Sequence, residues 1–158
     1  MDNRRNVLGR AGAVAAAVVA ATLVSVGPAR AAVHPPARSV AYAWAVAQRG
    51  KPFVPGAAGP RGFDCSGLVW AAYRHAGIRL PRATYQMVGS RELVRISGGQ
   101  ARRGDLAFYG PPGAPGHVAL VDTRGVVFSA YRPGEPAGWS RNGPWWHPSV
   151  FYRVAGAG

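Results

Sequence analysis

One stretch of the sequence decides how the rest is interpreted: Phe63-Asp64-Cys65-Ser66-Gly67-Leu68-Val69. The apolar residues that begin there recur at helical spacing, at Leu68, Val69, Ala72, Tyr73 and Ala76. Gly77 follows them, and glycine commonly terminates a helix because it tolerates a positive φ. The stretch therefore predicts a helix that begins at Cys65 and takes Asp64 as its N-cap residue.

Cys65 is the only cysteine in the chain, so no internal disulfide can form. The start of a helix carries about half a positive charge and unpaired N–H groups. Both favour the thiolate, which is the reactive form of cysteine. The position therefore makes Cys65 a candidate nucleophile, and the alternative is a buried structural cysteine, a common fate for this residue type.

A cysteine nucleophile needs a base, and four histidines are available. His34 lies near the N-terminus and His147 lies in an aromatic run. His75 is ten residues beyond Cys65 on the same helix, about 15 Å along its axis, which is too far for contact. His117 opens an expected strand after a Gly/Pro-rich loop, so it is the candidate base. The alternative is a structural, hydrogen-bonded histidine.

Helices are expected in the first half of the chain. A helix over residues 39–49 would have Ser39 as its cap and Gly50 as its stop. Three Pro and three Gly predict a loop over residues 51–62. A short third helix is expected within residues 81–90.

From Gly104 on, the pattern changes to short strands. The expected strands cover residues 105–109, 117–122, 126–129 and 150–154, and Thr123-Arg124-Gly125 forms a hairpin turn. Helices followed by an antiparallel sheet predict a single α+β domain.

Several strings together resemble the NlpC-type cell-wall cysteine peptidases, over about residues 40–154. They are Gly50-Lys51-Pro52-Phe53, Phe63 to Val69, Leu80-Pro81-Arg82, Gln86, Gly104-Asp105-Leu106 and Gly116-His117-Val118-Ala119. The resemblance implies a papain-like α+β fold. It also implies hydrolysis of peptide bonds in peptidoglycan stem peptides, often the bond from γ-D-glutamyl to a diamino acid.

The resemblance also assigns roles to residues. The family's nucleophile falls on Cys65 and its base on His117. Asp64 and Ser66 match the residues that lie near the substrate's amino end, and Arg82, in a matching string, is a further candidate substrate-binding residue.

Two positions of the catalytic site depart from the family. Ser129 stands twelve residues after the base, where a third polar residue, commonly His, is usual. Phe53 stands where the family has a Tyr whose hydroxyl faces the site, so Phe53 is also a candidate substrate-binding residue, and Pro55 replaces a usual Trp in the same loop. An orienting hydrogen bond is worth about 1 kcal/mol, which Ser129 could still supply as an acceptor, whereas a lost oxyanion donor costs about 100-fold in rate.

The N-terminus predicts export. Arg4, Arg5 and Arg10 precede an apolar stretch over residues 11–26, and Ala29-Arg30-Ala31 is a small-residue cleavage site. This order describes a secretory signal peptide over residues 1–31 and predicts a secreted or cell-wall protein. The alternative is a retained membrane anchor, for which the stretch is short. The Arg pair also partly matches a twin-arginine signal.

The expected organisation after cleavage is a short lead-in over residues 32–38 and a peptidase domain over residues 39–156. Removing the signal takes four Arg and Asp2 from 19 basic and 6 acidic residues. The remaining 15 basic and 5 acidic residues give +10, so the mature protein is basic in its own right and has no stable membrane span.

This charge predicts attraction to an anionic cell-wall polymer. The alternative is a scattered basic surface with no specific partner, because the Arg residues are dispersed. No nucleic-acid fingerprint is present, no ligand spacing predicts a metal, and no motif indicates a cofactor. Three tryptophans could line a groove, although core packing is the expected role: Trp139, Trp145 and Trp146.

Three functions remain open. The leading hypothesis is a peptidoglycan endopeptidase that uses a Cys–His thiol mechanism. The second is a catalytically degenerate wall-binding module of the same fold, which the departures at Phe53 and Ser129 favour. The third is another amide-cleaving Cys–His hydrolase, such as a wall amidase or a deacylating enzyme.

Binding of the mature protein to purified cell walls should weaken as salt rises, because the Debye length shrinks from about 10 Å at 0.1 M to about 3 Å at 1 M. Pull-down across a salt series measures this. Binding that holds at 1 M salt would contradict the charge argument and turn attention to the tryptophans.

Overall fold

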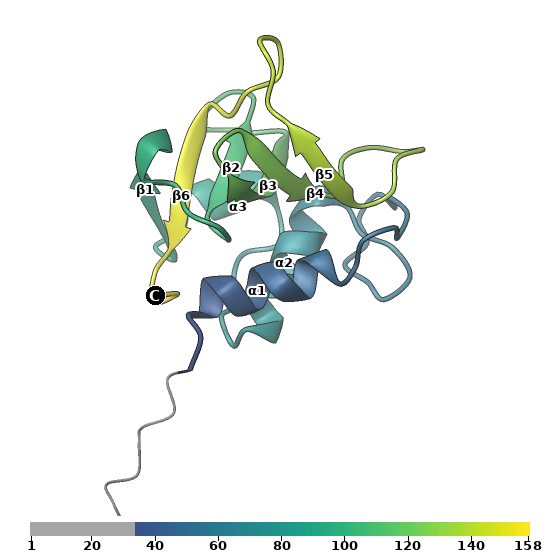
Figure 1. Ribbon diagram of the computed structural model, residues 1–158, viewed down its shortest axis with the longest axis horizontal. Helices are drawn as coiled ribbons and strands as arrows, with labels where there is room; N and C mark the ends of the chain where they lie inside the picture. The colour runs from purple at the N-terminus through teal and green to yellow at the C-terminus, as the bar shows by residue number, and fades with distance from the viewer. Residues whose placement is uncertain (1–33) are drawn as a thin grey trace, which may run out of the picture. The chain divides into compact units, whose positions relative to one another are not determined.

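The computed structural model describes residues 34–158, in which helices precede an antiparallel sheet (Figure 1). The helices are α1 (Ala37–Val46), α2 (Cys65–His75), α3 (Thr84–Val88) and the short 3-10 helix η1 (Gly98–Gln100). The strands are β1 (Leu93–Ile96), β2 (Leu106–Tyr109), β3 (His117–Thr123), β4 (Val126–Ser129), β5 (Gly138–Arg141) and β6 (Val150–Val154). Their order in the sheet is β1-β6-β2-β3-β4-β5. The α+β architecture predicted from the sequence is confirmed.

The strands at the centre of the sheet were predictable, whereas those at its edges were not. β4 and β6 have their predicted bounds, and β2 and β3 differ from them by one residue. β1 and β5 were missed. Both are short edge strands with exposed positions, so neither carries the run of apolar residues that marks a buried strand.

Helix α1 begins two residues earlier than predicted and ends three residues earlier. The carbonyl of Pro36 accepts hydrogen bonds from the N–H groups of Ser39 and Val40, so Pro36 rather than Ser39 is the N-cap. Residues 47–50 form a tighter turn, which ends at Gly50 with a φ of 86°. The expected cap was wrong because a carbonyl can start a helix without a side-chain cap.

Helix α2 has the predicted start and stop. The Asp64 side chain accepts a hydrogen bond of 2.6 Å from the N–H of Gly67. At the other end, Gly77 has a φ of 83°, and Ile78 donates its N–H to the carbonyl of Tyr73. This pairing is a Schellman motif, which satisfies carbonyls that the last helical turn leaves open.

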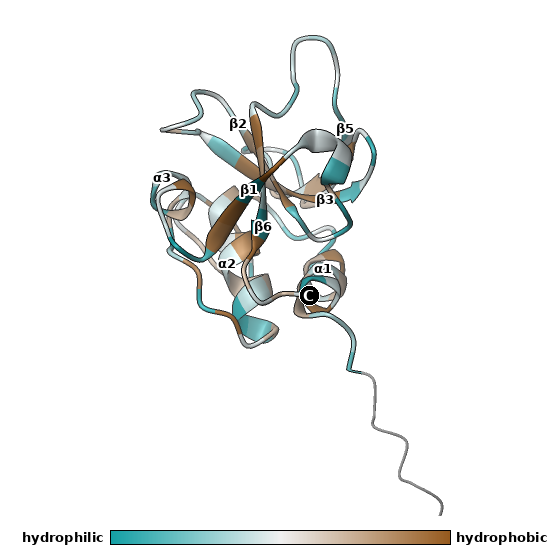
Figure 2. Cartoon of the chain, turned by 90° about the vertical axis from the view of Figure 1, so that its left-hand side faces the viewer, coloured by the Kyte–Doolittle hydropathy of each residue, from teal (hydrophilic) through white to brown (hydrophobic). Residues whose placement is uncertain are grey.

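The central strands β2 and β3 are buried on both faces over most of their length, and Figure 2 shows the apolar residues of the sheet in brown. One face packs against α1 and α2 and contributes Leu106, Phe108, Val118, Leu120 and Phe128 to the main core. The opposite face forms a second, smaller cluster of Ala107, Tyr109, Ala119, Val121 and Val127. Because side chains alternate along a strand, His117 and Ser129 belong to this second face.

A buried ion pair connects β2 to β6. Asp105 is fully buried just before β2, and both its oxygens accept hydrogen bonds from Arg153 of β6, at 3.0 and 2.7 Å. The N–H of Arg102 donates to the same carboxylate. A buried carboxylate needs such partners, since removing one leaves an uncompensated charge in the interior.

Replacing Arg153 with Met should lower the free energy of unfolding by about 3 kcal/mol, because Asp105 stays buried without its partner. Urea denaturation followed by circular dichroism measures the change. The matched control is Arg132→Met, which removes the exposed Arg132–Glu135 pair and should leave the midpoint unchanged. Equal effects of the two substitutions would contradict the structural role of the buried pair.

Candidate active site

The start of α2 is held by a cluster of polar side chains. Arg82 donates to both oxygens of Asp64, at 3.0 and 2.8 Å, and to the Ser66 hydroxyl at 2.9 Å. It also reaches the carbonyl of Ala57 in the preceding loop, at 3.1 Å. The structure thus brings together three predicted substrate-binding residues, Asp64, Ser66 and Arg82, and their contacts fix the helix start against the loop.

Gly67 permits this close packing. A Cβ atom at this position would lie 2.1 Å from the carbonyl oxygen of Ala57 and 2.8 Å from the guanidinium of Arg82. No side chain fits there without moving backbone. The glycine that follows Cys65 and Ser66 is therefore required by the approach of the loop.

Cys65 is the first residue of α2 and is half-buried. Burial raises the pKa of its thiol, and the nearby Asp64 carboxylate adds to the rise. The backbone amides of Val118, Ser66 and Cys65 itself act in the opposite direction. The expectation that the helix start favours a thiolate is therefore wrong for the free protein, since burial outweighs the helix N-terminus.

His117 is the first residue of β3, and its register partner is Tyr109 of β2. The imidazole is buried, with 7% of the residue exposed, and burial lowers its pKa to about 4. Helix α2 packs against β3, and the amide of the next residue, Val118, acts to lower the pKa of the Cys65 thiol. The structure thus places the start of α2, with Cys65, against the start of β3, with His117.

Three aromatic side chains surround the His117 ring, and we call them the aromatic cage: Tyr109, Tyr131 and Trp146. Their ring centroids lie 5.4, 5.2 and 5.7 Å from that of His117. This cage could not be predicted from the sequence. Tyr131 comes from the segment after β4 and Trp146 from the loop after β5, so only the folded sheet brings them to His117.

The two departures from the family pattern occupy different surroundings. Ser129 ends β4, pairs with Gly138 of β5 and is 4% exposed. Within residues 34–158, no hydrogen bond connects Ser129 to His117. Phe53 is half-buried and packs against the main core, and its backbone bridges to Phe63 just before the candidate nucleophile.

The expectation that the three tryptophans are core residues is wrong for Trp139 and Trp145, and Trp146 packs only against the second, smaller cluster. Trp145 is 97% exposed, and Trp139 is 44% exposed with its indole N–H donating to the hydroxyl of Tyr42. Trp146 is half-buried, and it packs on the cage rather than in the main core. Periodicity could not reveal this, because all three lie in or beside an edge strand.

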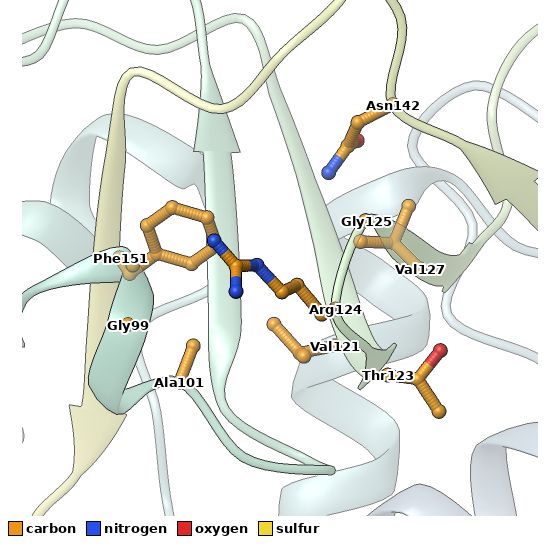
Figure 3. Close-up of a pocket in the computed structure, with 10 residues that line it drawn as sticks. Gly99, Ala101, Val121, Thr123, Arg124, Gly125, Val127, Asn142 and Phe151 are labelled. Carbon is orange, nitrogen blue, oxygen red and sulfur yellow. The ribbon is translucent and has the colours of Figure 1, made fainter.

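A pocket of about 330 Å³ lies away from Cys65 and His117 (Figure 3). Its lining residues come from η1, β3, β4, β6 and the adjoining loops, and Figure 3 shows Arg124 extending toward Phe151. It shares the sheet face of His117 but contains no candidate catalytic side chain. We therefore place the candidate site at the α2–β3 contact.

Neither a metal site nor a membrane span is present in the part of the chain that the structure describes. No three His, Cys, Asp or Glu side chains of residues 34–158 gather to hold an ion. Among the described helices, none has the length and apolar content needed to cross a bilayer. The expected signal peptide lies outside these residues.

Comparison with known proteins identifies similar sequences and structures. Residues 50–150 match the NlpC/P60 family. The murein DD-endopeptidase MepH of Escherichia coli is 37% identical over 92 residues, 56% of this chain and 34% of that protein. The bifunctional muramidase/DL-endopeptidase CwlT of Bacillus subtilis is 34% identical over 105 residues, which are 64% of this chain and 31% of that protein. This chain therefore spans about a third of the length of these curated relatives.

Solved structures support the fold. The chain superimposes on the NlpC/p60 domain of the peptidoglycan hydrolase SagA with a TM-score of 0.65 and 30% identity, covering 74% of this chain and 98% of that one. The chain also superimposes on RipD from Mycobacterium tuberculosis with a TM-score of 0.65 and 33% identity, covering 77% of this chain and 99% of that one. RipD is described as a non-catalytic NlpC/p60 domain protein adapted to peptidoglycan binding. The predicted papain-like α+β fold is confirmed.

Alkylation of Cys65 by iodoacetamide should be slow near neutral pH and should rise with a midpoint above that of a free thiol, because burial raises the thiol pKa. Rates measured by mass spectrometry from pH 5 to 11 give the midpoint. The control is the urea-denatured protein, which should titrate like a free cysteine. Alkylation of the folded protein that is fastest near pH 6 would indicate a thiolate–imidazolium pair instead.

Proposed function

The chain belongs to the NlpC/P60 family, and from this premise we propose that it is a peptidoglycan hydrolase that cleaves a peptide bond of the stem peptide. The proposed bond is the one from γ-D-glutamyl to a diamino acid. Cys65 is the nucleophile and His117 the base. The observation that carries the proposal is the packing of α2, which begins at Cys65, against β3, which begins at His117.

The proposed reaction begins from a neutral pair. With a pKa of about 4, His117 is neutral near pH 7 and can accept a proton from the Cys65 thiol. The sulfur then bonds to the carbonyl carbon of the substrate. When the C–N bond breaks, the imidazolium returns its proton to the leaving amine, and water hydrolyses the thioester that remains.

Backbone amides near the start of α2 stabilise the negative charge that develops during the proposed reaction. The N–H groups of Cys65, Ser66 and Val118 all favour negative charge at the sulfur. Donors that already face this point can also stabilise the oxyanion that develops beside it. This reduces the need for the tyrosine hydroxyl that Phe53 lacks.

Asp64, Ser66 and Arg82 are proposed to receive the substrate's amino end. The carboxylate of Asp64 already binds Arg82 and the N–H of Gly67. It therefore presents a fixed acceptor for an ammonium group, and Arg82 acts mainly by holding that acceptor in place.

Export and attachment complete the proposal. A signal peptide over residues 1–31 would deliver the protein to the cell wall, and the +10 charge of the mature chain would add attraction to an anionic polymer.

The second candidate function is a wall-binding module without activity. The similarity to RipD, the raised pKa of Cys65 and the departures at Phe53 and Ser129 favour it. It requires neither a nucleophile nor a base, so it gives no reason for the amide donors around the sulfur. That difference makes the hydrolase the leading proposal.

Wild-type protein should release stem-peptide fragments from purified peptidoglycan, and Cys65→Ala should abolish the release. Ser129→Ala should lower the rate only several-fold, since it removes at most one hydrogen bond of about 1 kcal/mol. Mass spectrometry of the digests identifies the bond, and substrates of several cross-link types widen the search.

Matched controls separate the three candidate functions. Cys65→Ala should still bind walls if binding and chemistry are independent, and Phe53→Tyr should raise the rate or leave it unchanged. Background-level release by the wild type on every substrate would exclude the hydrolase and leave the binder. Release of intact stem peptides from glycan would instead identify a wall amidase.

A further inference from the structure

His117 lacks the polar partner that usually orients a catalytic base. Within residues 34–158, no hydrogen bond connects its ring to Ser129, and no carboxylate forms an ion pair with it. A base must nevertheless be held at a fixed angle, because small errors of position reduce the rate steeply. Another feature of the fold must therefore orient this ring.

Trp146 contacts every other ring at this place. It stacks on Tyr109 with centroids 4.6 Å apart and planes 9° apart, and it lies 5.1 Å from Tyr131 and 5.7 Å from His117. Packed aromatic rings have preferred geometries, so each contact limits the orientations that the imidazole can take. Tyr109, at the end of β2, and Tyr131, in the segment after β4, contact the same ring.

The loop that carries Trp146 is itself fixed. Gly143 and Trp146 exchange backbone hydrogen bonds, of 2.8 and 3.3 Å. The N–H of Asn142 donates to the carbonyl of Gly125, and its side-chain oxygen accepts a 2.7 Å hydrogen bond from the hydroxyl of Tyr109. The tryptophan is therefore anchored to the β3–β4 turn and to the ring on which it stacks.

We propose that Trp146 is the positioning residue of His117, and that it orients the imidazole by packing where relatives use a polar third residue. The expected effect of Trp146 on the reaction rate rests on the proposed function. Its expected effect on the orientation and pKa of the His117 ring does not.

The cage also explains the state of the base. Burial lowers the pKa of His117. The titratable groups whose rings contact it are the two phenols of the cage, Tyr109 and Tyr131. Exposing the ring to water would therefore raise the pKa of His117 toward its ordinary value.

The test is a titration of the histidine ring by NMR in the wild type and in Trp146→Ala. His34, His75 and His147 are exposed, and the resonance of His117 is assigned by its loss in His117→Gln. The midpoint for His117 should rise from about 4 in the wild type toward about 6.5 in Trp146→Ala. Trp146→Phe, which keeps a flat ring, should retain the low midpoint.

The matched control is Trp145→Ala. Trp145 is the neighbouring tryptophan, and its side chain is 97% exposed, so its removal should change neither the titration nor the rate. On peptidoglycan, Trp146→Ala should lower kcat by about 10-fold to 100-fold with little change in KM, and Trp146→Phe should restore most of the loss.

Two outcomes would overturn the proposal: an unchanged midpoint in Trp146→Ala, or a larger loss of kcat in Ser129→Ala than in Trp146→Ala. An inactive wild type would refute the proposed function, while the titration would still decide whether Trp146 holds the ring. If circular dichroism shows that Trp146→Ala does not fold, Trp146→Leu replaces it, because leucine is apolar but has no flat ring. The His117 midpoint and kcat of this variant are then compared with those of the wild type.

Discussion

The candidate site depends on the hydrogen bonds that the carboxylate of Asp64 accepts. It caps α2 through the N–H of Gly67, and it binds both terminal nitrogens of Arg82. Through Arg82 it also connects the helix start to Ser66 and to the Ala57 carbonyl. One side chain thus fixes the position of Cys65, because the residues before and after it are both held.

Burial determines the protonation states at this site. It raises the pKa of Cys65 and lowers that of His117, so both groups are neutral near pH 7 in the free protein. Two neutral groups avoid the cost of two buried charges, whereas a preformed ion pair would need partners that compensate them. The backbone amides around the sulfur then matter chiefly as charge develops.

The departures from the family pattern are easier to understand from the structure. Phe53 contributes to the main core, and its backbone bridge to Phe63 keeps the loop beside Cys65 without a hydroxyl. Ser129 is buried at the end of β4, and the aromatic cage surrounds His117 instead. Stacking can replace a hydrogen bond in orienting a ring, since both restrict its rotation.

The local elements and the candidate pair of Cys65 and His117 could be predicted from the sequence alone. The start of α2 at Cys65, its Asp64 cap, its Gly77 stop and the strands at 126–129 and 150–154 follow from caps and periodicity, which act over a few residues. The resemblance to the family also predicts Asp64, Ser66 and Arg82 as substrate-binding residues, and the structure brings these three side chains together. Two features emerge only in the folded protein: burial outweighs the helix N-terminus at Cys65, and Tyr131 and Trp146 reach His117. Desolvation and contacts between distant segments depend on how the sheet packs, and no local pattern in the chain encodes them.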